Sequence, residues 1–134
     1  MYLVIASQDI SNLTLALLDK GDLAQSEEFF VPPEKHLVSI DEALGKWKVS
    51  INTLKGVIVI TGPGSFTASR VSVTLANSIA MTQKIPIWGI ANPENKTIKN
   101  LVGDLDLSKM PDKTFVLPDY NQEPHITLSK KTCG

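Results

Sequence analysis

The sequence predicts an α/β domain built on a mixed β-sheet. Three strand-like segments joined by short turns open the chain, and from residue 34 helical and strand-like segments alternate. The first pattern is typical of an antiparallel meander, and the second of parallel strands linked by helices. The chain has 134 residues, 43% of them hydrophobic, which suits one core. We therefore expect residues 1–134 to form a single domain.

The antiparallel part of the sheet is predicted within the first 31 residues. Residues 2–8 form a short apolar run, and residues 13–17 alternate leucine with Thr or Ala, as in a half-buried strand. Residues 23–31 complete the meander. Ser11-Asn12 and Lys20-Gly21-Asp22 supply the two turns.

A long amphipathic helix is predicted over residues 34–54. Its apolar residues recur at alternating spacings of three and four, which favours a narrow buried seam: Leu37, Ile40, Leu44, Trp47, Ile51 and Leu54. Gly45 weakens this helix by about 1 kcal/mol relative to Ala, so packing must hold it. Gly56 is placed to end it.

A strand, a glycine-containing turn and a second helix follow. Residues 57–60 are continuously β-branched, which fits a central strand covered on both faces. The Gly62-Pro63-Gly64-Ser65 turn leads into a helix from Phe66 to about Gln83, and residues 85–90 read as the next strand. Asn92-Pro93 predicts the start of a third helix. Short strands are expected at 114–117 and 125–128.

Composition excludes several classes of protein. The net charge of −1 excludes a strongly basic nucleic-acid module, and no apolar run reaches the roughly 18 residues of a membrane helix. The N-terminus does not read as a secretory signal. One cysteine, Cys133, excludes an internal disulfide framework, and with only His36 and His125 no metal centre is expected. We expect a cytoplasmic protein without membrane contact, and a solvent-exposed His36.

The charges are unevenly distributed along the chain. No acidic residue lies between Glu42 and Glu94, whereas this stretch carries four lysines and Arg70, which is the only arginine. A stretch rich in core residues would lack acidic groups for that reason alone. The same pattern also fits a surface that meets an acidic partner or phosphate. Arg70, one turn into the predicted helix, can reach a carboxylate or phosphate with its bidentate fork.

The turn after residues 57–60 is the most informative segment. Its glycines permit close backbone approach, and Ser65 can cap the following helix, whose N-terminus favours an anion. No Lys follows the second glycine, so the phosphate-binding loop GxxxxGK[ST] is absent. The hydrolase pattern GxSxG fails as well, since Pro63 and Thr67 stand at its glycine positions. A helix cap is favoured over a nucleophile for Ser65.

Gly62-Pro63-Gly64-Ser65-Phe66-Thr67, followed by Arg70, resembles the GPGSFTGLR signature of the bacterial tRNA threonylcarbamoyladenosine biosynthesis protein family TsaB (YeaZ). The Lys35-His36-Leu37 segment and the Ile85–Ile90 segment are also similar to the family. The resemblance implies the first lobe of an actin- and Hsp70-like (RNase H-like) fold. The second lobe of typical members is expected to be absent here.

The resemblance implies a non-catalytic subunit. Family members pair with the catalytic transferase TsaD and, with the ATPase TsaE, modify adenosine 37 of tRNA; they also form homodimers through the same face. The two helices flanking the motif, 34–54 and 66–82, would then form the interface, through Leu37, Ile40, Leu44, Trp47, Arg70, Val71 and Leu75. Contact with tRNA would be indirect, through the complex. ATP or ADP would be held only at the interface with a partner, and no cofactor is expected in this chain alone.

The sequence departs from the family pattern at two places. Ala6-Ser7-Gln8 stands where the first strand usually ends in Asp-Thr-Ser, and this loss of the Asp argues against nucleotide hydrolysis by this chain. Ala68-Ser69 replaces Gly-Leu, which predicts a more polar helix face. Two other hypotheses stay open: a small nucleotide-binding phosphotransferase or peptidase that uses the Gly62–Ser65 turn, and a homodimeric structural domain.

Overall fold

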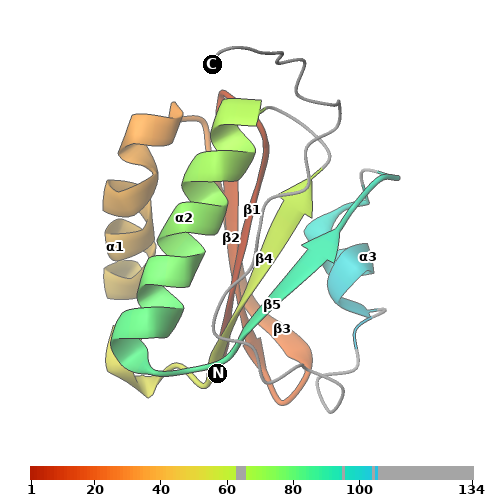
Figure 1. Ribbon diagram of the computed structural model, residues 1–134. Helices are drawn as coiled ribbons and strands as arrows, with labels where there is room; N and C mark the ends of the chain where they lie inside the picture. Colours follow the sequence, from red (N-terminus) through yellow and green to blue (C-terminus); the bar gives the residue numbers. More distant parts are fainter. Residues whose placement is uncertain (63–65, 95, 104, 106–134) are drawn as a thin grey trace.

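The computed structural model describes residues 1–62, 66–94, 96–103 and 105, with Gln8 and Phe66 described by their backbone alone. A five-stranded sheet forms the middle layer, with α1 (His36–Lys46) and α2 (Phe66–Gln83) side by side on one face and α3 (Ile98–Gly103) on the other (Figure 1). Two short 3-10 turns, η1 (Pro33–Lys35) and η2 (Ile51–Thr53), flank α1. No helix in the described ranges is long and apolar enough to cross a membrane.

The sheet has the order β3-β2-β1-β4-β5. Its strands are β1 (Tyr2–Asp9), β2 (Asn12–Asp19), β3 (Asp22–Phe29), β4 (Gly56–Gly62) and β5 (Ile87–Ala91). β1 pairs antiparallel with β2, and β2 with β3, whereas β4 is parallel to both β1 and β5. The predicted mixed sheet, with an antiparallel meander and a parallel half, is confirmed.

The turn between β2 and β3 explains part of the register. Asp19 pairs with Asp22, so Lys20 and Gly21 form a two-residue loop with φ of 56° and 86°. Positive φ at both central residues defines a type I′ turn, whose twist matches that of the adjoining strands. The predicted turn at Lys20-Gly21-Asp22 is therefore confirmed.

Each face of the sheet carries its own hydrophobic cluster. On the α1/α2 face the cluster includes Leu13, Leu15 and Leu17 of β2, the residues whose alternation predicted that strand. On the α3 face the cluster is much smaller and includes Ala16 and Leu18 of the same strand. Because β4 is covered on both faces, all seven of its residues are buried, and five of the eight residues of β2 are buried as well.

The predicted helix over residues 34–54 is too long. α1 ends at Lys46, because the Lys48 N–H donates to the Gly45 carbonyl (3.1 Å) and the Val49 N–H to the Leu44 carbonyl (2.9 Å). These two bonds, with Lys48 at φ 58°, form a Schellman cap that turns the chain out of the helix. Trp47 and Ile51 still pack against the core, but from beyond the end of α1, with Ile51 in η2. Gly56 does not end a helix; it begins β4.

α2 agrees with the predicted helix over 66–83. It ends with the same cap, in which Lys84 has φ 56° and the Ile85 N–H donates to the Ala80 carbonyl (3.0 Å). Ile85 therefore closes the helix, and β5 begins two residues later than predicted. In both caps lysine occupies the position where glycine is usual.

The third helix begins later than predicted. Asn92 is buried and its side chain bonds the backbone of Lys96, through Oδ1 to the N–H (2.9 Å) and Nδ2 to the carbonyl (3.1 Å). The helix starts instead at Ile98, after Thr97, whose Oγ1 accepts the Asn100 N–H (3.3 Å). Asn92 thus shapes the loop rather than capping α3. The strands expected at 114–117 and 125–128 lie outside the described residues.

Candidate functional site

β4 ends at Gly62, at the carboxyl edge of the parallel strands, where α/β folds place their ligands. Gly62 has φ 131°, a conformation that favours glycine, and its carbonyl accepts the Asn92 N–H (2.8 Å). Phe66 is the first residue of α2. Pro63, Gly64 and Ser65 lie outside the described residues, so the anion site and the Ser65 cap stay predictions.

The outward face of α2 carries a surface groove of about 360 Å³. Its lining residues follow the spacing of one helix face, and they are Thr67, Arg70, Val71, Thr74 and Leu75. Arg70 is the only charged residue in α2, and it is exposed. The structure therefore brings together the predicted residues Thr67, Arg70, Val71 and Leu75. Thr74 was missed, although it lies seven residues after Thr67, about two helical turns further along the same face.

The residues predicted on the first helix do not share one face. Leu37 is 60% exposed, whereas Ile40 and Leu44 are 2% and 6% exposed and belong to the core against the sheet. Ile40 and Leu44 are therefore wrong as interface residues: the seam of α1 packs on its own sheet. Trp47 is half-buried against the same core. Val38, 58% exposed, extends the apolar surface of α1 next to Leu37.

Two substitutions within the motif act differently from the prediction. Ala68 and Ser69 are 0% and 1% exposed, so they face inward and do not make the outer face of α2 more polar. The Ser69 hydroxyl has no hydrogen-bond partner among the described residues. The polar group predicted for the outer face of the helix, the Ser69 hydroxyl, is therefore buried inside the protein.

His36 is fully buried, contrary to the expected solvent-exposed position. Neither ring nitrogen has a hydrogen-bond partner within the described part of the chain. Burial lowers the pKa of His36 below its ordinary value, and the nearby Glu34 opposes this effect only in part. Such a ring is a packing element at the start of α1 and has no access to a substrate at the surface.

The first-strand triplet has structural contacts of its own. The Ser7 side chain is buried, and its hydroxyl donates to the Asn12 carbonyl (2.7 Å) across the β1–β2 hairpin. Ala6 lines a second cavity, on the α3 face of the sheet. No group of three or more His, Cys, Asp or Glu side chains suited to a metal ion occurs among the described residues.

Comparisons with known proteins extend over the part of the chain that contains these features. The family model described as TsaD: tRNA N6-adenosine threonylcarbamoyltransferase matches residues 33–105, more than half of the chain. TsaB of Bacillus subtilis is 30% identical over 97 residues, covering 69% of this chain and 42% of that protein. TsaB of Buchnera aphidicola is 39% identical over 57 residues, covering 42% and 27%. A threonylcarbamoyltransferase of Geobacter metallireducens is 38% identical over 68 residues, covering 48% and 20%.

Solved structures give the same fold. YeaZ from Pseudomonas aeruginosa superimposes with a TM-score of 0.60, and an uncharacterized protein from that organism with similarity to peptidase YeaZ superimposes with 0.61. Both are 19% identical, and each match covers 68% of this chain and 43% of the other. All the matches described span less than half of the relative's length. The expected actin-like (RNase H-like) fold is confirmed, and the chain belongs to the TsaD family, with the resemblance to TsaB (YeaZ) confirmed by its relatives.

Proposed function

We propose that this chain acts in tRNA threonylcarbamoyladenosine biosynthesis as a non-catalytic subunit that binds a TsaD-type transferase. The observation that carries the proposal is the outward face of α1 and α2, which combines exposed apolar side chains, a groove and a single arginine. The relatives named TsaB and threonylcarbamoyltransferase support the pathway. In this role the chain would act in the cytoplasm.

The chemistry of this face suits a helix from a partner. Leu37 and Val38 of α1 are more than half exposed, and α1 and α2 lie side by side on the same face of the sheet (Figure 1). Besides Arg70, only hydroxyl and aliphatic side chains line the groove on α2, so another helix can pack closely there. Arg70 would meet a carboxylate of the partner with its planar fork.

Catalysis would belong to the partner. Ala6 offers no carboxylate to a metal or a phosphate, and the buried His36 offers no accessible base. ATP or ADP would therefore be held only at the interface between the two subunits. A TsaE-type ATPase would join the same complex, and tRNA would reach this chain only through that complex.

Two other functions make different predictions. A homodimeric structural domain would use the same helix face, so the chain would dimerise and would not bind the transferase. A nucleotide-binding enzyme built on the Gly62–Ser65 turn would bind ATP or ADP by itself. Calorimetry with both nucleotides separates that enzyme from the proposed subunit, for which we expect no heat from the isolated chain.

The proposal is tested by mixing the chain with a TsaD-type transferase from the same source and separating the mixture by size exclusion. We expect a complex at micromolar concentrations, and we expect Leu37→Lys to abolish it. Ile10→Lys is the matched control, because Ile10 is a similarly exposed apolar residue (52%) in the β1–β2 turn. Absence of a complex, or equal loss in both variants, would reject this surface as the contact.

A further inference from the structure

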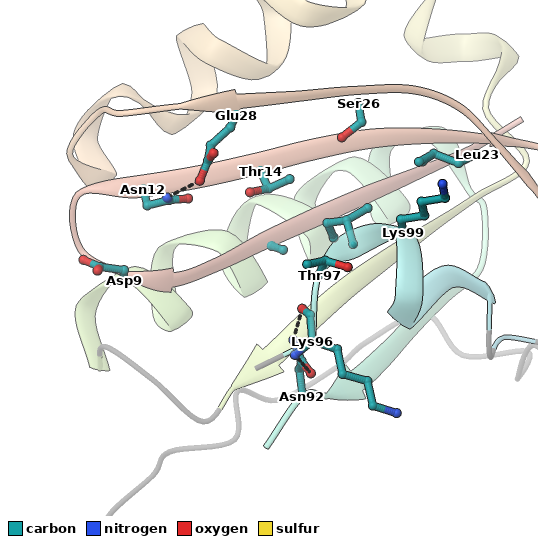
Figure 2. A pocket seen from close by; sticks show the side chains of 12 residues that line it. Asp9, Asn12, Thr14, Leu23, Ser26, Glu28, Asn92, Lys96, Thr97 and Lys99 are labelled. Atoms are coloured by element: carbon teal, nitrogen blue, oxygen red, sulfur yellow. Dashed lines mark hydrogen bonds between the residues drawn. The ribbon is translucent and has the colours of Figure 1, made fainter. Parts of the chain in front are cut away.

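The α3 face of the sheet holds a cavity of about 540 Å³ that the proposed partner contact does not use. This volume falls within the roughly 300–1,000 Å³ that small-molecule sites occupy. One wall comes from β1, β2 and β3, and the opposite wall from Asn92 and residues 96–99 (Figure 2). The cavity thus lies between two parts of the chain that are far apart in sequence.

The space exists because the sheet presents small and polar side chains here. Toward the other end of this face, Val4, Leu18 and Ile58 form the apolar cluster that α3 covers. Toward the β1–β2 hairpin, the same face carries Ala6 and Thr14, and no large side chain among the described residues fills the space above them. Ala6 therefore leaves this part of the cavity floor without a charged group.

The charges on the two walls are opposite and balanced. The lining contains two carboxylates, Asp9 and Glu28, and two ammonium groups, Lys96 and Lys99. Glu28 points toward Asn12 on the strand wall, and its carboxylate accepts a hydrogen bond from the Asn12 amide (Figure 2). Lys99 rises from α3 on the other wall, and it forms no ion pair with any described residue (Figure 2).

Hydroxyl groups lie between these two charges. Thr14 and Ser26 come from the strands, and Thr97 from the residue before α3 (Figure 2). A hydroxyl both donates and accepts hydrogen bonds, so these groups can bind either donor or acceptor groups of a ligand. The remaining charges are directed elsewhere: Asp9 Oδ1 accepts bonds from the Ser11 N–H and hydroxyl (both 3.1 Å), and Lys96 Nζ lies 3.4 Å from Glu94 Oε1.

From this arrangement we propose that the cavity binds a small zwitterion, with its ammonium group at Glu28 and Asn12 and its carboxylate or phosphate at Lys99. A polyanion such as a nucleotide would meet the Glu28 carboxylate, and a simple cation would meet the Lys99 ammonium. A ligand that carries both charges at opposite ends satisfies both walls at once. The absence of a carboxylate at Ala6 leaves room for such a ligand between the charges.

The test is titration of the isotopically labelled chain, followed by NMR, with γ-aminobutyrate and phosphoethanolamine as probes. These two probes distinguish a carboxylate from a phosphate at the acid end. Butyrate and butylamine, which carry one charge each, are the matched ligands. We expect shifts at Ala6, Thr14 and Thr97 with a zwitterion, and at least fivefold weaker binding of either singly charged ligand. Equal binding of the singly charged ligands would overturn the proposal. So would the absence of zwitterion binding at concentrations up to about 20 mM.

Two variants test where the charged ends of the ligand bind. Glu28→Gln keeps a hydrogen-bond acceptor for Asn12, and it should weaken the zwitterion about fivefold while leaving butyrate unaffected or tighter. Lys99→Gln should weaken the zwitterion equally and leave butylamine unaffected or tighter. Both residues are exposed, so melting curves should not move. Glu42→Gln and Lys55→Gln, exposed and outside the cavity lining, are the matched controls. Zwitterion binding that is unchanged in both cavity variants would overturn the assignment.

Discussion

The two faces of the sheet are covered in different ways. On one face, α1 and α2 enclose a cluster that draws on β1, β2, β4 and β5, with 16 buried members among the described residues. On the other face, α3, which is only six residues long, covers a cluster with five buried members among the described residues (Figure 1). A cavity lies beside this cluster. The thicker side therefore contributes most of the stability, and the thinner side leaves space for a ligand.

Adjacent leucines on β2 provide the largest test of this difference. Leu17 and Leu18 are 1% and 0% exposed, but they belong to the large and small clusters respectively. We expect Leu17→Ala to lower the free energy of unfolding by about 3–5 kcal/mol. Leu18→Ala should cost about 2–3 kcal/mol, because the short α3 can shift to fill part of the space. Urea unfolding of both variants measures this, and equal losses would show that the two faces are equally rigid.

His36 makes the α1/α2 face sensitive to pH. Because burial lowers the pKa of His36 in the folded chain, the unfolded chain binds the proton more readily. The stability from a neutral His36 is complete above the unfolded pKa of about 6.5, and it is lost as pH falls toward the folded pKa, by at most about 1.4 kcal/mol per pH unit. Unfolding of the wild type and His36→Leu between pH 7.5 and 5 measures this. Parallel pH profiles of the two proteins would contradict it.

Replacing the two capping lysines with glycine should stabilise the protein. Lys48 and Lys84 have φ of 58° and 56°, a conformation that is unfavourable for residues with a Cβ. Lys48→Gly and Lys84→Gly should each raise the free energy of unfolding by about 0.5–1 kcal/mol. Glycine at exposed Glu42, in the middle of α1, is the matched control and should lower it by about 1 kcal/mol. Destabilisation by glycine at both caps would show that the lysine side chains contribute more than the backbone strain costs.

The smallest effect on stability is expected at Arg70, on the outer surface. We expect Arg70→Glu to change the free energy of unfolding by less than about 0.5 kcal/mol, because the side chain is exposed. Association of this variant with the TsaD-type transferase should fall at least tenfold. The introduced carboxylate would repel the partner carboxylate that we propose for Arg70. Lys55→Glu is the matched reversal and should leave association unchanged. An Arg70→Glu chain that binds normally would remove Arg70 from the contact.

Strand β2 could be predicted from its local sequence because its apolar side chains alternate. Leu13, Leu15 and Leu17 face one side of the sheet, as expected for a period of two. The ends of the helices were harder to predict. The apolar spacing continues from Leu44 through Ile51, and it shows only that these side chains need burial. The Schellman cap at Lys48 was missed because glycine, the usual signal, is absent there.

The candidate site was partly predictable for the same reason. The Gly62–Arg70 motif identified the family and the helix that carries the groove. The spacing of Leu37, Ile40 and Leu44 indicated a contact seam, but periodicity does not distinguish a protein's own sheet from another protein. The structure assigned Ile40 and Leu44 to the sheet and left Leu37 outside.

By itself the sequence determined the α/β class, the mixed sheet, the second helix and the family, because each depends on residues close together in the chain. The tertiary structure decided which side of α1 is exposed, and it buried His36, Ala68 and Ser69. It also brought Glu28 and Lys99, 71 positions apart in the sequence, to opposite walls of one cavity. Such placements depend on the packing of distant segments against one sheet, which no local pattern encodes.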